Sequence, residues 1–114
     1  MPEIPKIKKQ NGFTTIDTIV NCHKGIAMRT ARSLVEETRR YVNEIYFLNN
    51  KQDLYDAKRI LDLVMIDIEK DPKIKVMVEG NDETAKKIAL RLYSALSSEN
   101  SYALDFDRYD GINA

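Results

Sequence analysis

The stretch Lys24-Gly25-Ile26-Ala27-Met28-Arg29-Thr30-Ala31 joins two segments with different patterns. Before it, residues 13–21 are rich in β-branched and aromatic side chains, which favour a β-strand. After a turn at Gly25, a helix is predicted, with Glu36 and Glu37 among the charged residues of its solvated face. Its core-facing positions follow the spacing of one helix face and are Ala31, Leu34, Val35, Thr38 and Val42.

Three further strands are predicted downstream. Residues 45–48 and 53–55 read as the two strands of a β-hairpin around a turn at 49–52. The alternating residues 73–78 read as the last strand.

Two more helices are expected. The second begins at an N-cap on Asp56 and stops near Asp71, because Pro72 disfavours helix in the residue before it. The third follows a turn and cap at residues 80–82. Their apolar stripes are Ala57, Ile60, Leu61, Val64, Met65 and Ile68 in the second helix and Ala85, Ile88, Ala89, Leu92, Tyr93 and Leu96 in the third.

The resulting order, β-α-β-β-α-β-α, predicts an α+β fold with three helices on one face of a four-stranded antiparallel sheet. A ferredoxin-like domain has a similar order and is the alternative architecture. We expect an N-terminal arm at 1–12, one domain at 13–98 and an acidic, aromatic tail at 99–114. The helix stripes should meet over the last strand; the residues involved are Leu34, Val35, Ile60, Leu61, Val64, Ile88 and Leu92 above Ile74, Val76 and Val78.

Composition narrows the class of protein. The chain has 114 residues, 43% of them hydrophobic, and 18 basic against 18 acidic residues, so no excess of positive charge favours nucleic acid as a partner. No run reaches the roughly 18 apolar residues of a membrane span. The single cysteine, Cys22, provides neither a disulfide nor a metal-binding set. We therefore expect a cytoplasmic protein without a metal or other cofactor.

The opening stretch resembles the active loop of the histidine-containing phosphocarrier HPr, whose pattern is Gly-[Leu/Ile]-His-Ala-Arg-Pro-Ala. Gly25, Ile26, Arg29 and Ala31 match that pattern, whereas Ala27 stands at the phospho-accepting histidine and Thr30 at the proline. Residues 78–83 also resemble the family's Gly-x-Asp-Glu segment before the last helix. The resemblance covers roughly residues 13–98 and implies an HPr-like open-faced β-sandwich, a bacterial origin and a relation to the sugar phosphotransferase system.

The resemblance implies a second site, a regulatory serine at the start of the middle helix. Arg59 takes its place here, or Lys58 if the register slips by one residue. No serine occurs between Ser33 and Ser94, so either register lacks the hydroxyl group. Phosphorylation of such a serine would add about −1.5 to −2 charge, whereas this chain has fixed positive charge.

The expected binding residues lie around these two places. Gly25 and Arg29 could hold an anion or carboxylate at the start of the first helix, although Arg29 could equally be an ordinary surface arginine. An apolar patch on the second helix could contact a protein, although part of that stripe must be core. The predicted binding set is Gly25, Met28, Arg29, Arg59, Ile60, Leu61 and Val64.

Together these features predict a non-enzymatic, HPr-like regulatory or protein-binding module whose partner is unidentified. One alternative is a phosphocarrier that uses His23, the only histidine, although it lies on the wrong side of Gly25 to receive the N–H groups of the helix start. Another is an unrelated α+β binding domain. The tail residues Tyr102, Phe106 and Tyr109 could add a recognition strand to a sheet edge or form a disordered end.

Overall fold

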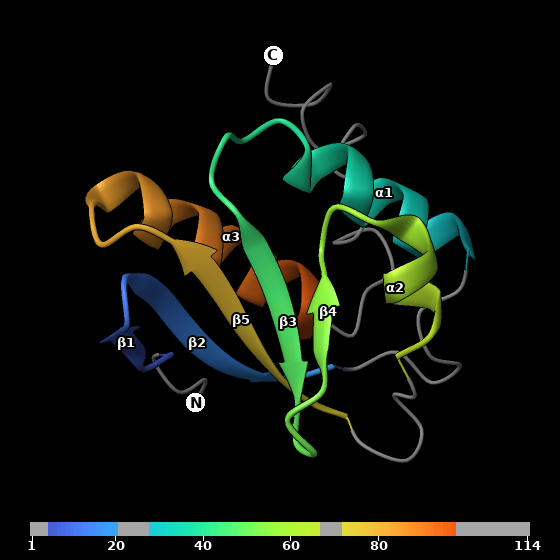
Figure 1. The fold of residues 1–114 in the computed structure, drawn as a ribbon, viewed down its shortest axis with the longest axis horizontal. Helices are drawn as coiled ribbons and strands as arrows, with labels where there is room; N and C mark the ends of the chain where they lie inside the picture. The colour runs from blue at the N-terminus through green and yellow to red at the C-terminus, as the bar shows by residue number, and fades with distance from the viewer. Residues whose placement is uncertain (1–4, 21–27, 67–71, 98–114) are drawn as a thin grey trace.

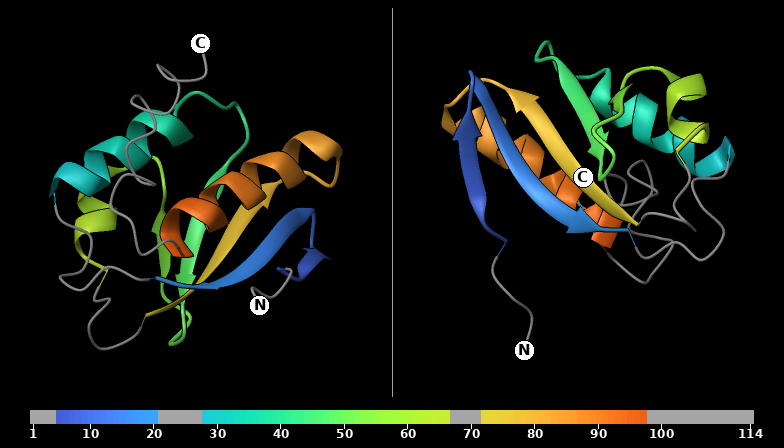
Figure 2. Two further views of the ribbon diagram at one scale, coloured as in Figure 1. Left: turned by 180° about the vertical axis from the view of Figure 1, so that it is seen from behind. Right: turned by 60° about the horizontal axis from the view of Figure 1, so that its bottom comes forward.

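The computed structural model describes residues 5–20, 28–66 and 72–97, with residues 28 and 29 described by their backbone only. Three helices cover one face of a five-stranded antiparallel sheet (Figures 1 and 2). The elements are β1 (Ile7–Gln10), β2 (Phe13–Ile19), α1 (Met28–Thr38), β3 (Ile45–Asn49), β4 (Leu54–Asp56), α2 (Ile60–Val64), β5 (Lys73–Glu79) and α3 (Glu83–Ser97). The predicted α+β class and its three helices are confirmed. No helix in these ranges is long and apolar enough to cross a membrane.

The sheet is arranged around β5, in the spatial order β1-β2-β5-β3-β4. β2 and β3 both pair with β5, so Val76 faces Ile16 on one side and Phe47 on the other. The predicted hairpin is present as β3 and β4, with Phe47 opposite Tyr55. Because β5 is central, the residues of its covered face form the middle of the core.

The prediction of four strands was wrong, because the segment expected to be an arm contains β1. This strand pairs with β2, placing Ile7 opposite Ile16 and Gln10 opposite Phe13. Asn11 and Gly12 connect them with φ values of 51° and 83°, the pair of positive φ angles that a type I′ hairpin turn requires. Polar side chains dominate β1, and only Ile7 packs against the core, so the strand has little hydrophobic alternation.

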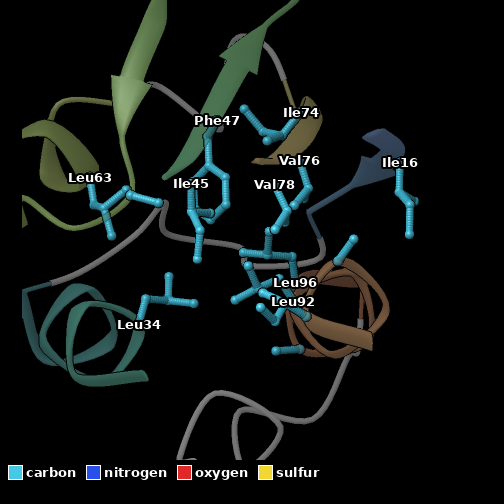
Figure 3. Packing of buried hydrophobic residues seen from close by; sticks show 14 of the residues in the cluster. Ile16, Leu34, Ile45, Phe47, Leu63, Ile74, Val76, Val78, Leu92 and Leu96 are labelled. Carbon is cyan, nitrogen blue, oxygen red and sulfur yellow. The ribbon is translucent and has the colours of Figure 1, made fainter. Parts of the chain in front are cut away.

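The core lies between the sheet and the helices, as Figure 3 shows. The expected meeting of the helix stripes over the last strand is confirmed for α3, and the stripe of α1 is buried in the same core cluster. Each side chain concerned is less than a tenth exposed; they are Leu34, Val35, Ile88 and Leu92 above Ile74, Val76 and Val78.

The second helix differs most from its prediction. It begins at Ile60 rather than after Asp56, because Asp56 and Lys58 form a turn in which Asp56 Oδ1 accepts a hydrogen bond from the Lys58 N–H at 2.9 Å. That turn shifts the helical phase. Leu63 is therefore fully buried, whereas Leu61 is 62% exposed and Met65 72% exposed. The expected helix end near Asp71 and the stripe residue Ile68 lie outside the described ranges.

Two predictions about the first helix were also wrong. The helix ends at Thr38, whose hydroxyl donates to the carbonyl oxygen of Ala57 at 2.7 Å, and Val42 beyond it is 97% exposed. Glu37, expected on the solvated face, is 1% exposed. It is buried because α3 packs beside this part of the chain and supplies Arg91, whose Nε donates to Glu37 Oε2 at 2.7 Å.

Candidate functional site

The start of α1 is the first predicted site. β2 ends at Ile19, and the next N–H, that of Val20, donates to the Pro72 carbonyl at 2.9 Å. α1 begins at Met28, so its first turn presents N–H groups with no partner inside the helix. The predicted binding residues Gly25, Met28 and Arg29, the alternative acceptor His23, and Ala27 at the family's histidine position lie outside the described ranges or are described by backbone alone. Their roles therefore stay predictions.

The start of α2 is the second predicted site, and the structure describes it fully. Arg59 is the N-cap residue, with an extended backbone and no side-chain capping bond. Its carbonyl oxygen accepts the N–H groups of Asp62 and Leu63 at 3.1 and 3.3 Å. The guanidinium group is exposed and has no hydrogen bond or ion pair to any described residue. Arg59 is thus the residue at the helix start, and its charge faces solvent.

Lys58, the other candidate for this position, has a different environment. Its Nζ donates to the Tyr41 carbonyl at 2.6 Å, and its own carbonyl accepts the Arg39 Nε at 3.0 Å. These two bonds tie the segment after α1 to the turn before α2. Arg39, the residue that follows the end of α1, therefore belongs to this junction. Lys58 holds the junction together, while Arg59 is available to a partner.

Two carboxylates moderate the positive charge at this junction. Asp62 Oδ2 accepts a hydrogen bond from the Asp56 N–H at 2.8 Å, and Asp62 lies in the first turn of α2. A carboxylate near a helix start is favourable because the local dipole is positive there. Three cations, Arg39, Lys58 and Arg59, thus lie close to two anions, which leaves the junction moderately cationic.

Apolar side chains on α2 are exposed directly beside Arg59. Leu61 and Met65 are four residues apart, a spacing that puts two side chains on the same face of a helical turn. Ile60 and Val64 are only partly buried and pack against the core. Of the predicted patch, Leu61 is therefore the most exposed member. Met65, predicted to be a core residue, adds to the exposed apolar surface.

A hydrogen-bonded network fixes the segment at the end of α1, next to the turn that precedes α2. Tyr41 donates its hydroxyl hydrogen to Glu37 Oε2, and Arg40 Nη1 lies 3.5 Å from Glu37 Oε1. Burial, then the hydrogen bond to Glu37 and the charge of that carboxylate, raise the pKa of Tyr41 to about 12. The Tyr41 hydroxyl is therefore a neutral hydrogen-bond donor at ordinary pH. Its bond to Glu37 holds the residue where the Tyr41 carbonyl accepts a hydrogen bond from Lys58 Nζ.

The described residues offer no grouped ligands for a metal. Within residues 5–20, 28–66 and 72–97, no three histidine, cysteine or acidic side chains are clustered as a metal site would need. What the junction provides is one exposed cation and two exposed apolar side chains on a short helix. Such an arrangement is suited to binding a protein surface.

Comparison with known proteins matches this architecture. The sequence profile of the family described as "PTS HPr component phosphorylation site" matches residues 14–95. The solved structure of a phosphocarrier protein HPr from Bacillus anthracis strain Ames is 23% identical and has a TM-score of 0.60; the match covers 77% of this chain and 100% of that one. The histidine-containing phosphocarrier protein of Mycoplasma is 20% identical, with a TM-score of 0.57, over 68% of this chain and 88% of that one. A search of curated proteins finds no match.

Proposed function

We propose, on the premise that this chain belongs to the HPr family of phosphocarrier proteins, that it binds a protein partner without itself carrying a phosphoryl group. Proteins of this family are phosphocarriers rather than catalysts, and they interact with protein partners in the phosphotransferase system. We therefore propose a non-enzymatic regulatory module of the cytoplasm, derived from that system.

The exposed surface of α2 is the observation that carries this proposal. We name it the docking face and define it by Arg59, Leu61 and Met65, bordered by Ile60 and Val64. α2 packs against α1, so Met28 and Arg29 at the start of α1 are included in the proposed contact. An exposed apolar pair beside an arginine suits a partner with an acidic rim and a hydrophobic anchor, because arginine is enriched among the residues that dominate interface energies and burial of the apolar pair is favourable.

The loss of phosphoryl transfer is proposed from the residue types at the two family sites. The methyl group of Ala27 cannot accept a phosphoryl group, and Thr30 replaces the proline of the family pattern. At the start of α2, the N-cap position holds Arg59, whose guanidinium cannot be phosphorylated by a serine kinase. Fixed positive charge there would disfavour a partner that recognises a phosphoserine.

Site-specific photo-crosslinking tests the docking face. A photoreactive amino acid replaces Leu61 in one variant and Lys87, an exposed residue of α3, in a matched control. In cells that make this protein, we expect the variant at 61 to form one predominant protein adduct and the variant at 87 to form none of that mass. Adding Arg59→Glu to the Leu61 variant should reduce the adduct, because the partner's acidic rim is then repelled.

Removal of residues 99–114 is the second arm of this experiment. If the docking face binds the partner, the adduct at position 61 persists after the truncation. Loss of the adduct on truncation, with no effect of Arg29→Glu and Arg59→Glu together, would instead assign binding to the tail and contradict the proposal.

A further inference from the structure

A cavity of about 750 Å³ lies at one end of the sheet, away from the docking face. It occurs where β2 and β3 end and β5 begins, and the last turns of α3 complete its wall (Figure 1). Its volume is within the range of about 300–1,000 Å³ that is usual for small-molecule sites. The lining residues that matter for its chemistry are Thr18, Leu48, Lys73, Ile74, Lys75 and Tyr93.

Strand register explains how apolar and charged groups meet in this wall. Thr18 pairs with Ile74 across β2 and β5, and both are buried on the helix-covered face. Lys75 lies between Asp17 and Leu48 on the adjacent strands. Because neighbouring residues of a strand point to opposite faces, the cavity extends around the end of the sheet from an apolar side to a charged side.

Two polar groups of the wall lack partners among the described residues. Thr18 is 5% exposed, and its buried Oγ1 has no hydrogen bond within residues 5–20, 28–66 and 72–97. Lys75 is partly buried, and its ammonium group forms no hydrogen bond or ion pair within the same ranges, not even with Asp17 opposite it. Buried polar groups are normally satisfied by protein or by a bound molecule, and an ammonium group without a carboxylate partner can form a charge-assisted hydrogen bond with an anion.

From these features we propose that the cavity binds a small organic anion. The apolar body of the ligand contacts Ile74, Leu48 and Tyr93, and its carboxylate or phosphate group pairs with Lys75, while Lys73 adds a second cation. The Asp17 carboxylate in the same wall reduces the net charge of the three groups to +1, which favours a ligand with one anionic group over a polyanion. The cavity is separate from α2. This protein could therefore bind the small ligand in the cavity while its protein partner occupies the docking face.

Nuclear magnetic resonance titration of the full chain tests this proposal with phenyl phosphate and benzoate as probes. We expect saturable shifts of the Thr18, Ile74 and Tyr93 amide signals with one or both probes, and whichever binds more tightly identifies the anionic group. Phenol and inorganic phosphate should bind more weakly than the tighter of the two probes, because each carries only half of the recognised chemistry.

A matched pair of variants separates the cavity from surface charge in general. Lys75→Gln should weaken probe binding by about tenfold or more, as expected for losing a charge-assisted hydrogen bond. Lys87→Gln, on the exposed side of α3, removes the same charge and should leave the affinity unchanged. Equal effects of the two variants, or no saturable shift at the three amides with either probe, would overturn the proposal. Both variants change exposed or partly buried lysines, and amide spectra report directly whether each is folded.

Discussion

Glu37 of α1 and Arg91 of α3 form a 2.7 Å hydrogen-bonded ion pair in which the carboxylate is 1% exposed. Tyr41 donates to the same carboxylate oxygen, and the Tyr41 carbonyl accepts Lys58 just before α2. A continuous set of polar contacts therefore links α3 to the helix that carries the docking face. Since α2 has only five residues, too few to be stable alone, these contacts and the packing of Leu63 in the core together hold its exposed side chains in place.

Removing the Glu37 carboxylate charge should destabilise the whole fold. We expect Glu37→Gln to lower the free energy of unfolding by about 1–3 kcal/mol, because Arg91 and Tyr41 lose a charged acceptor. The Arg91 side chain is 39% exposed, so water replaces part of the lost interaction. Urea unfolding measures the effect. Glu36→Gln is the control on the exposed side of α1 and should change stability by less than about 0.5 kcal/mol. Equal losses in the two variants would show that the buried ion pair of Glu37 and Arg91 adds no more stability than an exposed carboxylate.

The raised pKa of Tyr41 should make the stability of the fold depend on pH in the alkaline range. Its pKa is raised from 10.0 to about 12 in the folded chain, so the neutral phenol is favoured by folding. The associated stability is fully present below pH 10 and is lost as the pH rises from 10 towards 12. Ultraviolet titration of tyrosinate, taken as wild type minus Tyr41→Phe, should give a midpoint well above 10. A difference curve centred near 10 would mean that Tyr41 has neither the burial nor the hydrogen bond to Glu37 that raise its pKa here.

Two threonines of β2 should respond in opposite ways to replacement by valine. Thr14 donates its hydroxyl to the Gly80 carbonyl at 2.8 Å, so Thr14→Val should cost about 1–2 kcal/mol. Thr18 Oγ1 is buried without a partner in the described part of the chain, so Thr18→Val should be neutral or slightly stabilising. Thermal unfolding of both variants without added ligand compares them directly. A loss at Thr18 as large as that at Thr14 would indicate that its hydroxyl is hydrogen-bonded after all.

Elements with a clear hydrophobic period could be predicted from the sequence, whereas an element without one could not. β5 and α3 have clear strand and helix periods over 7 and 15 residues, and their core faces were predicted correctly. β1 was missed because Lys8, Lys9 and Gln10 give no alternating apolar pattern. The Asn11-Gly12 pair was nevertheless a usable signal, since this dipeptide favours a two-residue hairpin turn.

The docking face was only partly predictable, because the residue at which α2 begins decides which of its side chains point to solvent. A helix starting at Asp56 would turn Met65 inward, whereas the turn at Asp56 and Lys58 delays the start and exposes Met65 instead. Capping preference favoured the aspartate, but the Asp56 side chain closes that local turn. Burial of Glu37 was equally inaccessible to sequence, because its partner Arg91 is 54 positions away.

The most direct test of the account is incubation of the protein with phosphoenolpyruvate and the family's enzyme I, followed by mass measurement of the intact chain. We predict no phosphoryl adduct on the wild-type chain, because Ala27 offers no acceptor atom. The double variant Ala27→His with Thr30→Pro should gain an acid-labile adduct and so serves as the positive control. An adduct on the wild-type chain that disappears with His23→Ala would contradict the account and identify the protein as a phosphocarrier with a displaced histidine.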